Sequence, residues 1–382
     1  MAVTGTGAGR GPLAGTVVVE AATFMSGPYA GMMLADLGAD VIKVEGERGD
    51  PFRSFGRPTT PYSSVFANCN RSKRSVVIDL KSDAGRAELL GLLADADVFL
   101  ANWRAGVAES LGLADDVLVA ANPRLVRCFV TGFGPSGPRA ADPAFDTVIQ
   151  ALSGLSDALD DGDEPLLVPG YPLDKVAATF ATQAILAALL ARERTGHGDR
   201  IELPMLDIAT YFDFADLFTN RVFLDHQPAA AHNAQVSAIR PLRTADGWIV
   251  VATVTGRQIA AACRAIGHPE WVDEILSQPD QGSLAKVMFD TIERGTAVLT
   301  TDDVLARFAA HDVAAASCLT MDQHLADAQV AHNELYTVEE WNGIGRVRTV
   351  RYPATSARWG RLRAPGTAPR LGHDAELTEG EG

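Results

Sequence analysis

Asp174 is the side chain whose position points most directly to chemistry. It follows Pro172-Leu173 and opens the apolar stretch Asp174 to Arg192, which leaves little polar face and therefore predicts a buried helix. The plain role of an aspartate there is an N-cap that accepts a backbone N–H. The partial positive charge of a helix N-terminus also favours the ionised carboxylate, which can act as a covalent nucleophile. The two roles are compatible.

Polar and glycine-containing loops follow several predicted strands. These loops are Ser26-Gly27-Pro28, Asp79-Leu80-Lys81, Asn102-Trp103-Arg104 and Thr131 to Gly134. In open parallel sheets, ligands bind at the carboxyl ends of the strands. A basic residue in two of the loops and a tryptophan suit a nucleotide that carries phosphates and a purine ring, although ordinary solvated loops remain the alternative for each. The glycines of Gly132 to Gly134 let a ligand approach the backbone closely.

Other catalytic chemistries lack their residue patterns. The eight histidines show no HxxxH or HxH spacing, GxSxG is absent, and the cysteines, Cys69, Cys128, Cys263 and Cys318, form no CxxC pair. We therefore expect no metal, no serine nucleophile and reduced thiols.

Charge and hydropathy restrict the partners. The formal net charge of −15 argues against nucleic acid, whose binding depends on clustered Lys and Arg. Met1 to Leu13 has no apolar core of a leader peptide, and no later stretch reaches the roughly 18 uninterrupted apolar residues of a membrane span. We expect a soluble cytoplasmic protein that binds neither nucleic acid nor a membrane.

Strands and helices alternate through the first part of the chain. The expected strands are residues 16–20, 40–44, 74–80, 97–101 and 125–130, and the helices between them include 26–37 and 84–94. This alternation predicts a parallel, doubly wound α/β sheet.

The character of the sequence changes after Thr210, where aromatic residues cluster before a linker-like stretch. Leu242 to Thr255, with the turn pair Asp246-Gly247, predicts a β-hairpin, and Gln258 to Ile266 predicts a helix. The expected organisation is a large α/β domain over 1–205, a linker over 206–235, a small α+β domain over 236–325, and a linker with a C-terminal segment over 326–382.

From about Leu13 to His373, an ordered set of motifs resembles a known family. The motifs are Ser26-Gly27-Pro28, Leu37 to Glu45, Asn70 to Ser75, Asp79 to Lys81, Asn102 to Gly106, Thr131 to Gly134, Gln150 to Gly154, Asp174, Ile185 to Leu189 and Arg194 to Gly198. Each is weak alone, but the ordered set is similar to the class III CoA-transferases, also called the CaiB/BaiF or formyl-CoA transferase family.

The resemblance implies a Rossmann-like large domain that the C-terminal segment completes, a small domain, and two subunits threaded as interlocked rings in a homodimer. It implies CoA thioesters and carboxylic acids as substrates, and no metal. By the same resemblance, Asp174 matches the catalytic aspartate. The positions that match CoA contacts are Met25, Ser26, Ile78, Asp79, Leu80, Lys81, Asn102, Trp103, Arg104, Thr131, Gly132, Phe133 and Gly134.

The chemistry that the resemblance implies begins with attack of the Asp174 carboxylate on a donor thioester. A mixed anhydride and CoA thiolate form, and the thiolate then produces an aspartyl-CoA thioester and the free acid. The acceptor acid reverses these steps.

Two other functions remain open. The 2-methylacyl-CoA racemases of the same superfamily use a histidine directly before an aspartate, where this chain has Phe145-Asp146. The other alternative is a CoA-binding protein without turnover, in which Asp174 only caps a helix. Four aromatic residues suit an acyl pocket, but we interpret them as core residues: Phe145, Tyr171, Phe180 and Phe214.

Overall fold

The computed structural model describes residues 11–159, 164–218, 221–225, 239–362 and 366–377. The chain forms two compact units. Unit 1 combines residues 1–157, 167–212 and 333–382, and unit 2 combines residues 158–166 and 213–332. The predicted boundaries at 205, 235 and 325 stay a prediction, and the stretch 226–235 lies outside the described residues.

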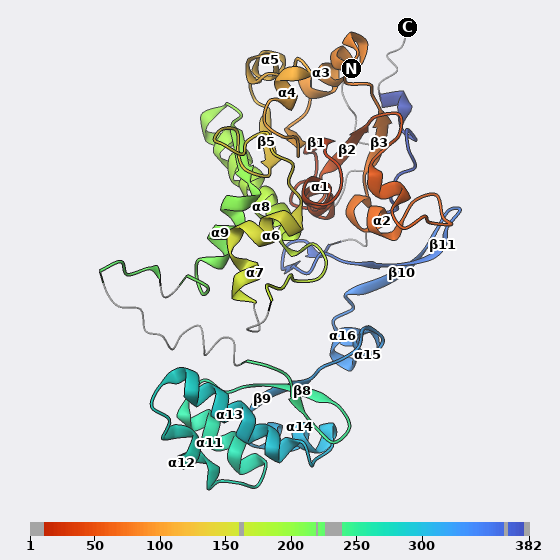
Figure 1. The fold of residues 1–382 in the computed structure, drawn as a ribbon. Coiled ribbons are helices and arrows are strands. Elements are labelled where there is room, and N and C mark those ends of the chain that lie inside the picture. Colours follow the sequence, from red (N-terminus) through yellow and green to blue (C-terminus); the bar gives the residue numbers. More distant parts are fainter. Residues whose placement is uncertain (1–10, 160–163, 219–220, 226–238, 363–365, 378–382) are drawn as a thin grey trace. The chain divides into compact units, whose positions relative to one another are not determined.

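A six-stranded parallel sheet organises unit 1 (Figure 1), and it confirms the predicted α/β class. Its strands are β1 (Val17–Ala21), β2 (Asp40–Glu45), β3 (Arg74–Val77), β4 (Val98–Ala101), β5 (Val126–Thr131) and β6 (Arg200–Pro204). The order is β3-β2-β1-β4-β5-β6, with Val18 opposite both Val41 and Val98. This is the doubly wound order, in which the direction of winding reverses between β1 and β4.

Helices cover both faces of this sheet because its strands are apolar on both sides. On one face, Val18, Val41 and Val98 pack with α1 (Ser26–Asp36) and α8 (Pro172–Thr195). On the other face, Val19, Ile42 and Phe99 pack with α3 (Asp83–Ala94) and α5 (Asp115–Ala121). The three layers are therefore helix, sheet and helix.

Helix α8 is long and apolar enough to cross a membrane by length and composition. Its residues Leu173, Ala177, Ala181 and Ile185 are nevertheless buried in the core of unit 1. Core helices meet the same criterion, and the packing of α8 is that of a core helix.

Further elements complete unit 1. They are η1 (Pro51–Ser54), α2 (Ser64–Asn70), α4 (Val107–Ser110), α6 (Asp146–Ser153), α7 (Leu155–Ala158), α9 (Met205–Asp213), β10 (Tyr336–Trp341), β11 (Gly345–Val350), β12 (Thr355–Ser356), β13 (Gly360–Arg361) and η3 (Ala375–Leu377), with the ends of α7 and α9 reaching into unit 2. Strands β10 and β11 pair as an antiparallel hairpin.

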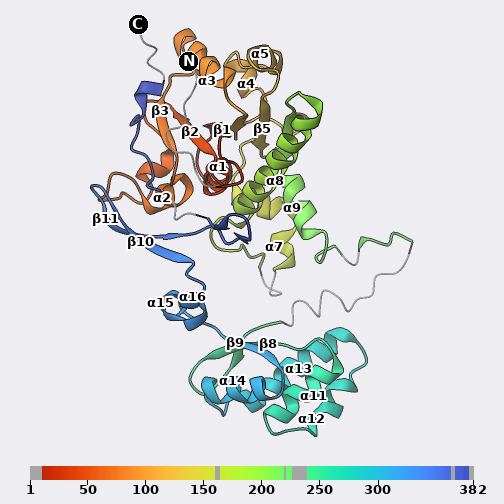
Figure 2. The ribbon, with the colours of Figure 1, turned by 180° about the vertical axis from the view of Figure 1, so that it is seen from behind.

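The C-terminal segment lies beside β3 at the edge of the sheet (Figure 2). The Ser75 amide donates to Asp374 Oδ2 at 2.9 Å, and the Asp374 amide donates to the Ser75 carbonyl at 3.1 Å. Gly366 N donates to Ser72 Oγ at 2.6 Å, and Tyr62 donates to the Ala368 carbonyl at 2.9 Å. Residues 366–374 thus lie along the edge strand β3 of unit 1.

Unit 2 is a small α+β unit. Its sheet has the order β7-β8-β9, with β7 (Leu242–Arg243), β8 (Trp248–Ala252) and β9 (Ala314–Ser317) all antiparallel. The predicted hairpin with its Asp246-Gly247 turn is confirmed. The helices are α11 (Gly256–Ala265), α12 (Trp271–Leu276), α13 (Gln281–Thr296), α14 (Thr301–Ala310), α15 (Met321–Ala326) and α16 (Ala328–His332).

Candidate active site

A pocket of about 160 Å³ lies where β1, β4 and β5 end. It is lined by Thr23, Phe24, Ser26, Asn102, Trp103, Arg104, Val130, Thr131, Gly132, Asp142, Ala144, Phe145, Asp174 and Met205. The loops after β1 and β4 flank the point where the winding of the sheet reverses, which is where doubly wound sheets bind ligands. Pockets for drug-sized ligands start at about 300 Å³, so this one suits the reactive end of a larger molecule.

Asp174 is the third residue of α8, so the prediction that it caps this helix is wrong. The helix begins at Pro172, a residue suited to the first helical position, and Tyr171 precedes it without a side-chain cap. Instead, the Asp174 amide donates to Asp146 Oδ2 at 2.9 Å. The carboxyl group of Asp174 is thereby left to face the pocket.

The pKa of Asp174 is raised from its ordinary value to about 7. Burial is the main cause, the charge of Asp146 adds to it, and a hydrogen bond with Ser26 opposes it by stabilising the ionised form. A carboxyl group with this pKa is more basic than an ordinary one and still ionises near neutral pH.

Asp146 joins α6 to the start of α8. It is 1% exposed, and its Oδ1 accepts a hydrogen bond of 2.5 Å from Gln150 Nε2. The side chain of Gln150 also bonds the backbone of Val168. Its Oε1 accepts from Val168 N at 2.9 Å, and its Nε2 donates to Val168 O at 3.2 Å. The loop before α8 is therefore fixed to α6 by two side chains.

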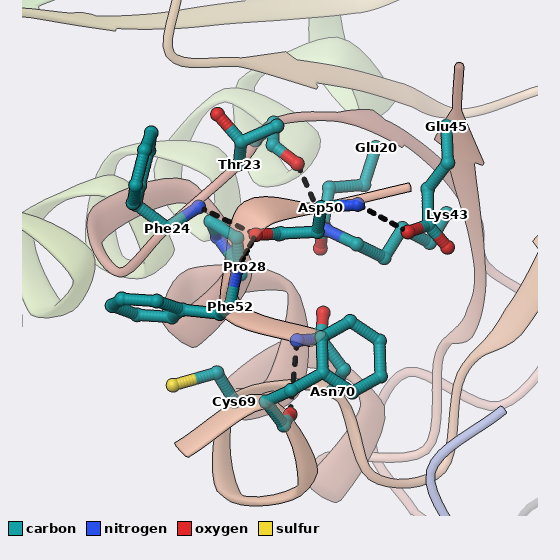
Figure 3. A network of polar contacts seen from close by, with 12 residues as sticks. Glu20, Thr23, Phe24, Pro28, Lys43, Glu45, Asp50, Phe52, Cys69 and Asn70 are labelled. Carbon is teal, nitrogen blue, oxygen red and sulfur yellow. Dashed lines mark hydrogen bonds and ion pairs between the residues drawn. The ribbon is translucent and has the colours of Figure 1, made fainter. Parts of the chain in front are cut away.

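The loop between β1 and α1 is held by three side chains. Asn102 accepts from Thr23 N at 3.0 Å and donates to Thr23 O at 2.7 Å. Lys43 Nζ donates to Ala22 O at 2.8 Å, and Asp50 Oδ1 accepts from Phe24 N at 3.2 Å (Figure 3). Asn102 is therefore engaged with the protein backbone at this loop.

A buried ionic network lies behind this loop (Figure 3). Lys43 Nζ is 3.0 Å from Glu20 Oε1 and 3.0 Å from Asp50 Oδ2, and Lys73 Nζ is 2.6 Å from Glu20 Oε2. Burial alone would lower the pKa of Lys43, but the neighbouring carboxylates raise it well above its usual range. For Lys73 burial dominates and lowers the pKa to about 8, although Glu20 opposes the shift.

Seven of the predicted site residues line the pocket: Ser26, Asn102, Trp103, Arg104, Thr131, Gly132 and Asp174. Asp79, Leu80 and Lys81 follow β3 at the same edge of the sheet, outside this pocket. Met25 and Ile78 are buried, at 9% and 2% exposed, and neither lines the pocket. Phe133 and Gly134 follow β5 without lining the pocket.

The lack of a side chain at Gly132 serves packing. A Cβ at this position would lie 2.3 Å from the Cβ of Ala144, which lines the pocket. Gly132 itself lines the pocket, and the prediction that a ligand approaches the backbone of this loop stays a prediction.

The sequence did not identify Phe24, Asp142, Ala144 or Met205 as pocket residues, and its interpretation of Phe145 as a core residue is wrong. Phe145 is 54% exposed and lines the pocket, and Phe214, in unit 2, is 50% exposed. The sequence did offer one indication that Phe145 is a pocket residue. It directly precedes Asp146, at the position where the racemases have their histidine. Phe24 follows β1 by only a few residues, which is the signal that selected Ser26.

A shallow depression adjoins the pocket and shares Trp103, Arg104 and Thr131 with it. Arg200 lines its far side, with its guanidinium 4.8 Å above the Phe129 ring and 2.6 Å from Glu202. Over the described part of the chain, His, Cys, Asp and Glu side chains form no group of three that could hold a metal ion.

Comparison with known proteins gives a consistent result. The model of CoA-transferase family III matches residues 13–375. A probable fatty acyl-CoA transferase of Mycobacterium tuberculosis is 32% identical over 94% of both chains. A succinate–glutarate CoA-transferase of Agrobacterium fabrum is 30% identical over 96% of this chain and 94% of its own.

Solved structures agree with these matches. The crystal structure of a CaiB/BaiF family protein from Brucella suis superposes with a TM-score of 0.81 at 29% identity, over 96% of this chain and 98% of that one. A family model that spans nearly the whole chain, together with a full-length structural match, decides the assignment. This protein belongs to CoA-transferase family III, the CaiB/BaiF family of enzymes.

Proposed function

We propose that this enzyme moves CoA from an acyl-CoA donor to a free carboxylic acid, with Asp174 as the covalent nucleophile. The observation that carries the proposal is the position of the Asp174 carboxyl group, which faces a pocket at the carboxyl end of the sheet and has its pKa raised to about 7. Once ionised, such a carboxylate is a better nucleophile than an ordinary aspartate because it is more basic.

In the first half of the reaction, a carboxylate oxygen of Asp174 attacks the thioester carbonyl of the donor. The C–S bond breaks, CoA leaves as a thiolate, and a mixed anhydride joins Asp174 to the acyl group. The thiolate then attacks the side-chain carbonyl of Asp174. The donor acid leaves as a carboxylate, and Asp174 carries CoA as a thioester.

In the second half, the carboxylate of the acceptor acid attacks this aspartyl thioester and displaces the CoA thiolate. The thiolate attacks the acceptor carbonyl of the new anhydride, which releases acceptor acyl-CoA and restores the Asp174 carboxylate. Since no step consumes water, the pocket must exclude it.

The N-termini of two helices support the charged intermediates. Ser26 is the first residue of α1, Asp174 lies in the first turn of α8, and both line the pocket. The partial positive charge at these helix ends favours the oxyanion that forms at each attack. Ser26 also hydrogen-bonds the Asp174 side chain, which fixes the nucleophile.

For CoA, we propose that Trp103 and Arg104 hold the nucleotide part along the depression beside the pocket, with Lys81 and the loop after β5 as further contacts. The Trp103 ring packs on Phe99 with centroids 5.7 Å apart, and Arg104 is exposed. An aromatic face and a cation suit a purine and a phosphate.

We also propose a cytoplasmic homodimer of interlocked subunits. Two adjacent aromatic side chains of α9 are exposed in the single chain, Tyr211 at 73% and Phe212 at 56%. Contiguous exposed aromatic residues are typical of protein interfaces. A second copy of the chain is the partner that the proposed ring arrangement supplies.

The racemase alternative gains no support from the pocket. Phe145 stands where the racemases have their histidine, and its ring cannot accept a proton.

Trapping of the covalent intermediate tests the proposal. Incubation with a panel of acyl-CoA thioesters, followed by hydroxylamine, should convert Asp174 to a hydroxamate that peptide mass spectrometry locates. Asp174→Asn should give no adduct, whereas Asp207→Asn, which changes an exposed aspartate in the first turn of α9, should give the wild-type result. No hydroxamate at Asp174 with any thioester would overturn the proposal.

A further inference from the structure

Two aromatic rings form one wall of the pocket that contains Asp174. Phe24 and Phe145 both line the pocket, and their rings meet edge to face with centroids 5.4 Å apart. Phe24 also meets Phe52 edge to face at 5.5 Å, and Phe52 lies 6.3 Å from Tyr171, three residues before Asp174. The nucleophile is therefore bordered by an aromatic cluster from four separate stretches of the chain.

The backbone of Phe24 adopts a conformation that a bulky residue rarely takes. Its φ is 63°, in the left-handed region, and such a conformation persists only where surrounding contacts enforce it. Asp50 supplies one of these contacts by accepting from Phe24 N at 3.2 Å and from Phe52 N at 2.9 Å. Figure 3 shows the rings of Phe24 and Phe52 on the side of Asp50 that faces away from Glu45.

Asp50 is itself fixed on all sides. It is 1% exposed, its Oδ2 lies 3.0 Å from Lys43 Nζ, and its amide donates to Glu45 Oε1 at 2.8 Å. Lys43 in turn donates to Ala22 O, so the ion pair holds the chain on both sides of Thr23. The buried side chain of Asp50 thus holds the Phe24 backbone in the conformation from which its ring enters the pocket.

The charges in the pocket disfavour a second carboxylate on the substrate. Among the described residues that line it, Arg104 is the only cation, and it belongs to the loop assigned to CoA, whereas Asp142 and Asp174 are both acidic. A carboxylate that leaves water needs a paired cation or several donors. An aromatic wall instead favours an apolar chain.

We propose that Phe24 and Phe145 form the acyl-binding wall of this enzyme, that Asp50 positions Phe24 by accepting a hydrogen bond from its amide, and that the preferred acids are monocarboxylic with an apolar chain. This inference rests on the proposed CoA transfer at Asp174. Phe24 and Phe145 determine specificity, and Asp50 is a positioning residue that touches no substrate.

The test compares two acceptor acids, hexanoate and glutarate, by kcat/KM with one common donor. Wild-type enzyme should prefer hexanoate by about tenfold or more, the size expected for a hydrophobic pocket that discriminates several methylenes. Phe145→Ala should lower kcat/KM for hexanoate about tenfold through KM and leave glutarate within about twofold. Phe55→Ala is the matched control, because Phe55 is 50% exposed and packs on Phe52 without lining the pocket.

Two variants of Asp50 separate positioning from general stability. Asp50→Asn keeps an oxygen for the Phe24 amide and should retain most of the preference for hexanoate, whereas Asp50→Ala should lose it. A purely structural role would lower kcat/KM equally for both acids and leave their ratio unchanged. If Asp50→Ala does not fold, Phe145→Ala carries the test, because this half-exposed side chain can be removed without a buried charge.

A wild-type preference for glutarate, or an equal loss for both acids in Phe145→Ala, would overturn the inference. Detection of the hydroxamate at Asp174 distinguishes a failure of the acyl-wall inference from a failure of the proposed CoA transfer. An adduct with a dicarboxylic thioester but none with an apolar one would retain CoA transfer and reject the aromatic acyl wall.

Discussion

The backbone amide of Asp174 donates a hydrogen bond of 2.9 Å to Oδ2 of Asp146. One carboxylate thus caps the first turn of the helix that carries the other. The same contact brings two negative charges together, and the charge of Asp146 is the second cause, after burial, of the raised pKa of Asp174. Asp146 therefore fixes the place of the proposed nucleophile and adds to the effect of burial on its proton affinity.

The rate of aspartyl-CoA formation should rise through about pH 7, where Asp174 loses its proton. Asp146→Asn removes a negative neighbour of Asp174 and should move the rise in rate to lower pH. Ser26→Ala removes a hydrogen bond to the ionised form and should move it to higher pH. Stopped-flow or quench measurements of the adduct against pH check both directions, and shifts of the same sign would contradict the assigned causes.

Asp174→Asn should stabilise the fold at alkaline pH. A carboxyl group whose pKa rises from 3.8 unfolded to about 7 folded opposes folding once the pH exceeds the unfolded value, and this cost reaches its full size above pH 7. The gain in free energy of unfolding should be on the order of 2 to 4 kcal/mol at pH 8 and smaller at pH 5. Urea titrations at both pH values check it, and a gain that grows toward acid pH would contradict the prediction.

The sheet could be predicted because its strands are short apolar runs separated by helix-like periods and by turn residues. The strands at 17–21, 40–45, 98–101 and 126–131 all match expectation within a residue or two. Strand β6 was missed, since Arg200 and Glu202 give it an alternating polar pattern. Such a pattern is typical of a half-exposed strand and gives a weaker signal than a buried run.

Trp103→Ala should weaken CoA binding about tenfold, or by roughly 1 to 2 kcal/mol, if the ring stacks on the purine. Calorimetric titration with CoA measures this directly. Trp359→Ala is the control, because Trp359 is 48% exposed and does not line the pocket. Equal affinities for both variants would place the nucleotide elsewhere.

Lys43→Met should lower the free energy of unfolding by about 3 to 5 kcal/mol, since it leaves Asp50 as a buried charge without its cation. Lys175→Met, at an exposed position in α8, should change it by less than about 0.5 kcal/mol. Denaturant unfolding of the two variants measures the difference. A similar stability of both would mean that the buried network contributes little.

The proposed interlocked dimer should survive dilution. Two closed rings cannot separate without partial unfolding, so the dimer mass should persist at nanomolar concentration for hours, whereas an ordinary interface would reach equilibrium with monomer. Mass photometry after dilution checks this expectation. A monomer fraction that grows within minutes would exclude threaded subunits.

The candidate site could be predicted only in part. Asp174 and the loops after β1, β4 and β5 could be identified because they lie at the ends of predicted strands and helices. The buried partners do not, because Glu20, Lys43 and Asp50 come from three positions that only the folded sheet brings together. Nothing local in the sequence distinguishes a charged residue that is 0% exposed, such as Lys43, from one on the surface.

The C-terminal segment has a consequence for protein synthesis. Residues 366–374 are synthesised about 290 residues after Ser72 and Ser75, yet they bond to Ser75 in the outer strand of the sheet and to Ser72 just before it. Until they leave the ribosome, β3 presents the open edge of a sheet, and an open edge can pair with strands of other chains. The later segment therefore removes this pairing surface by bonding along β3 itself.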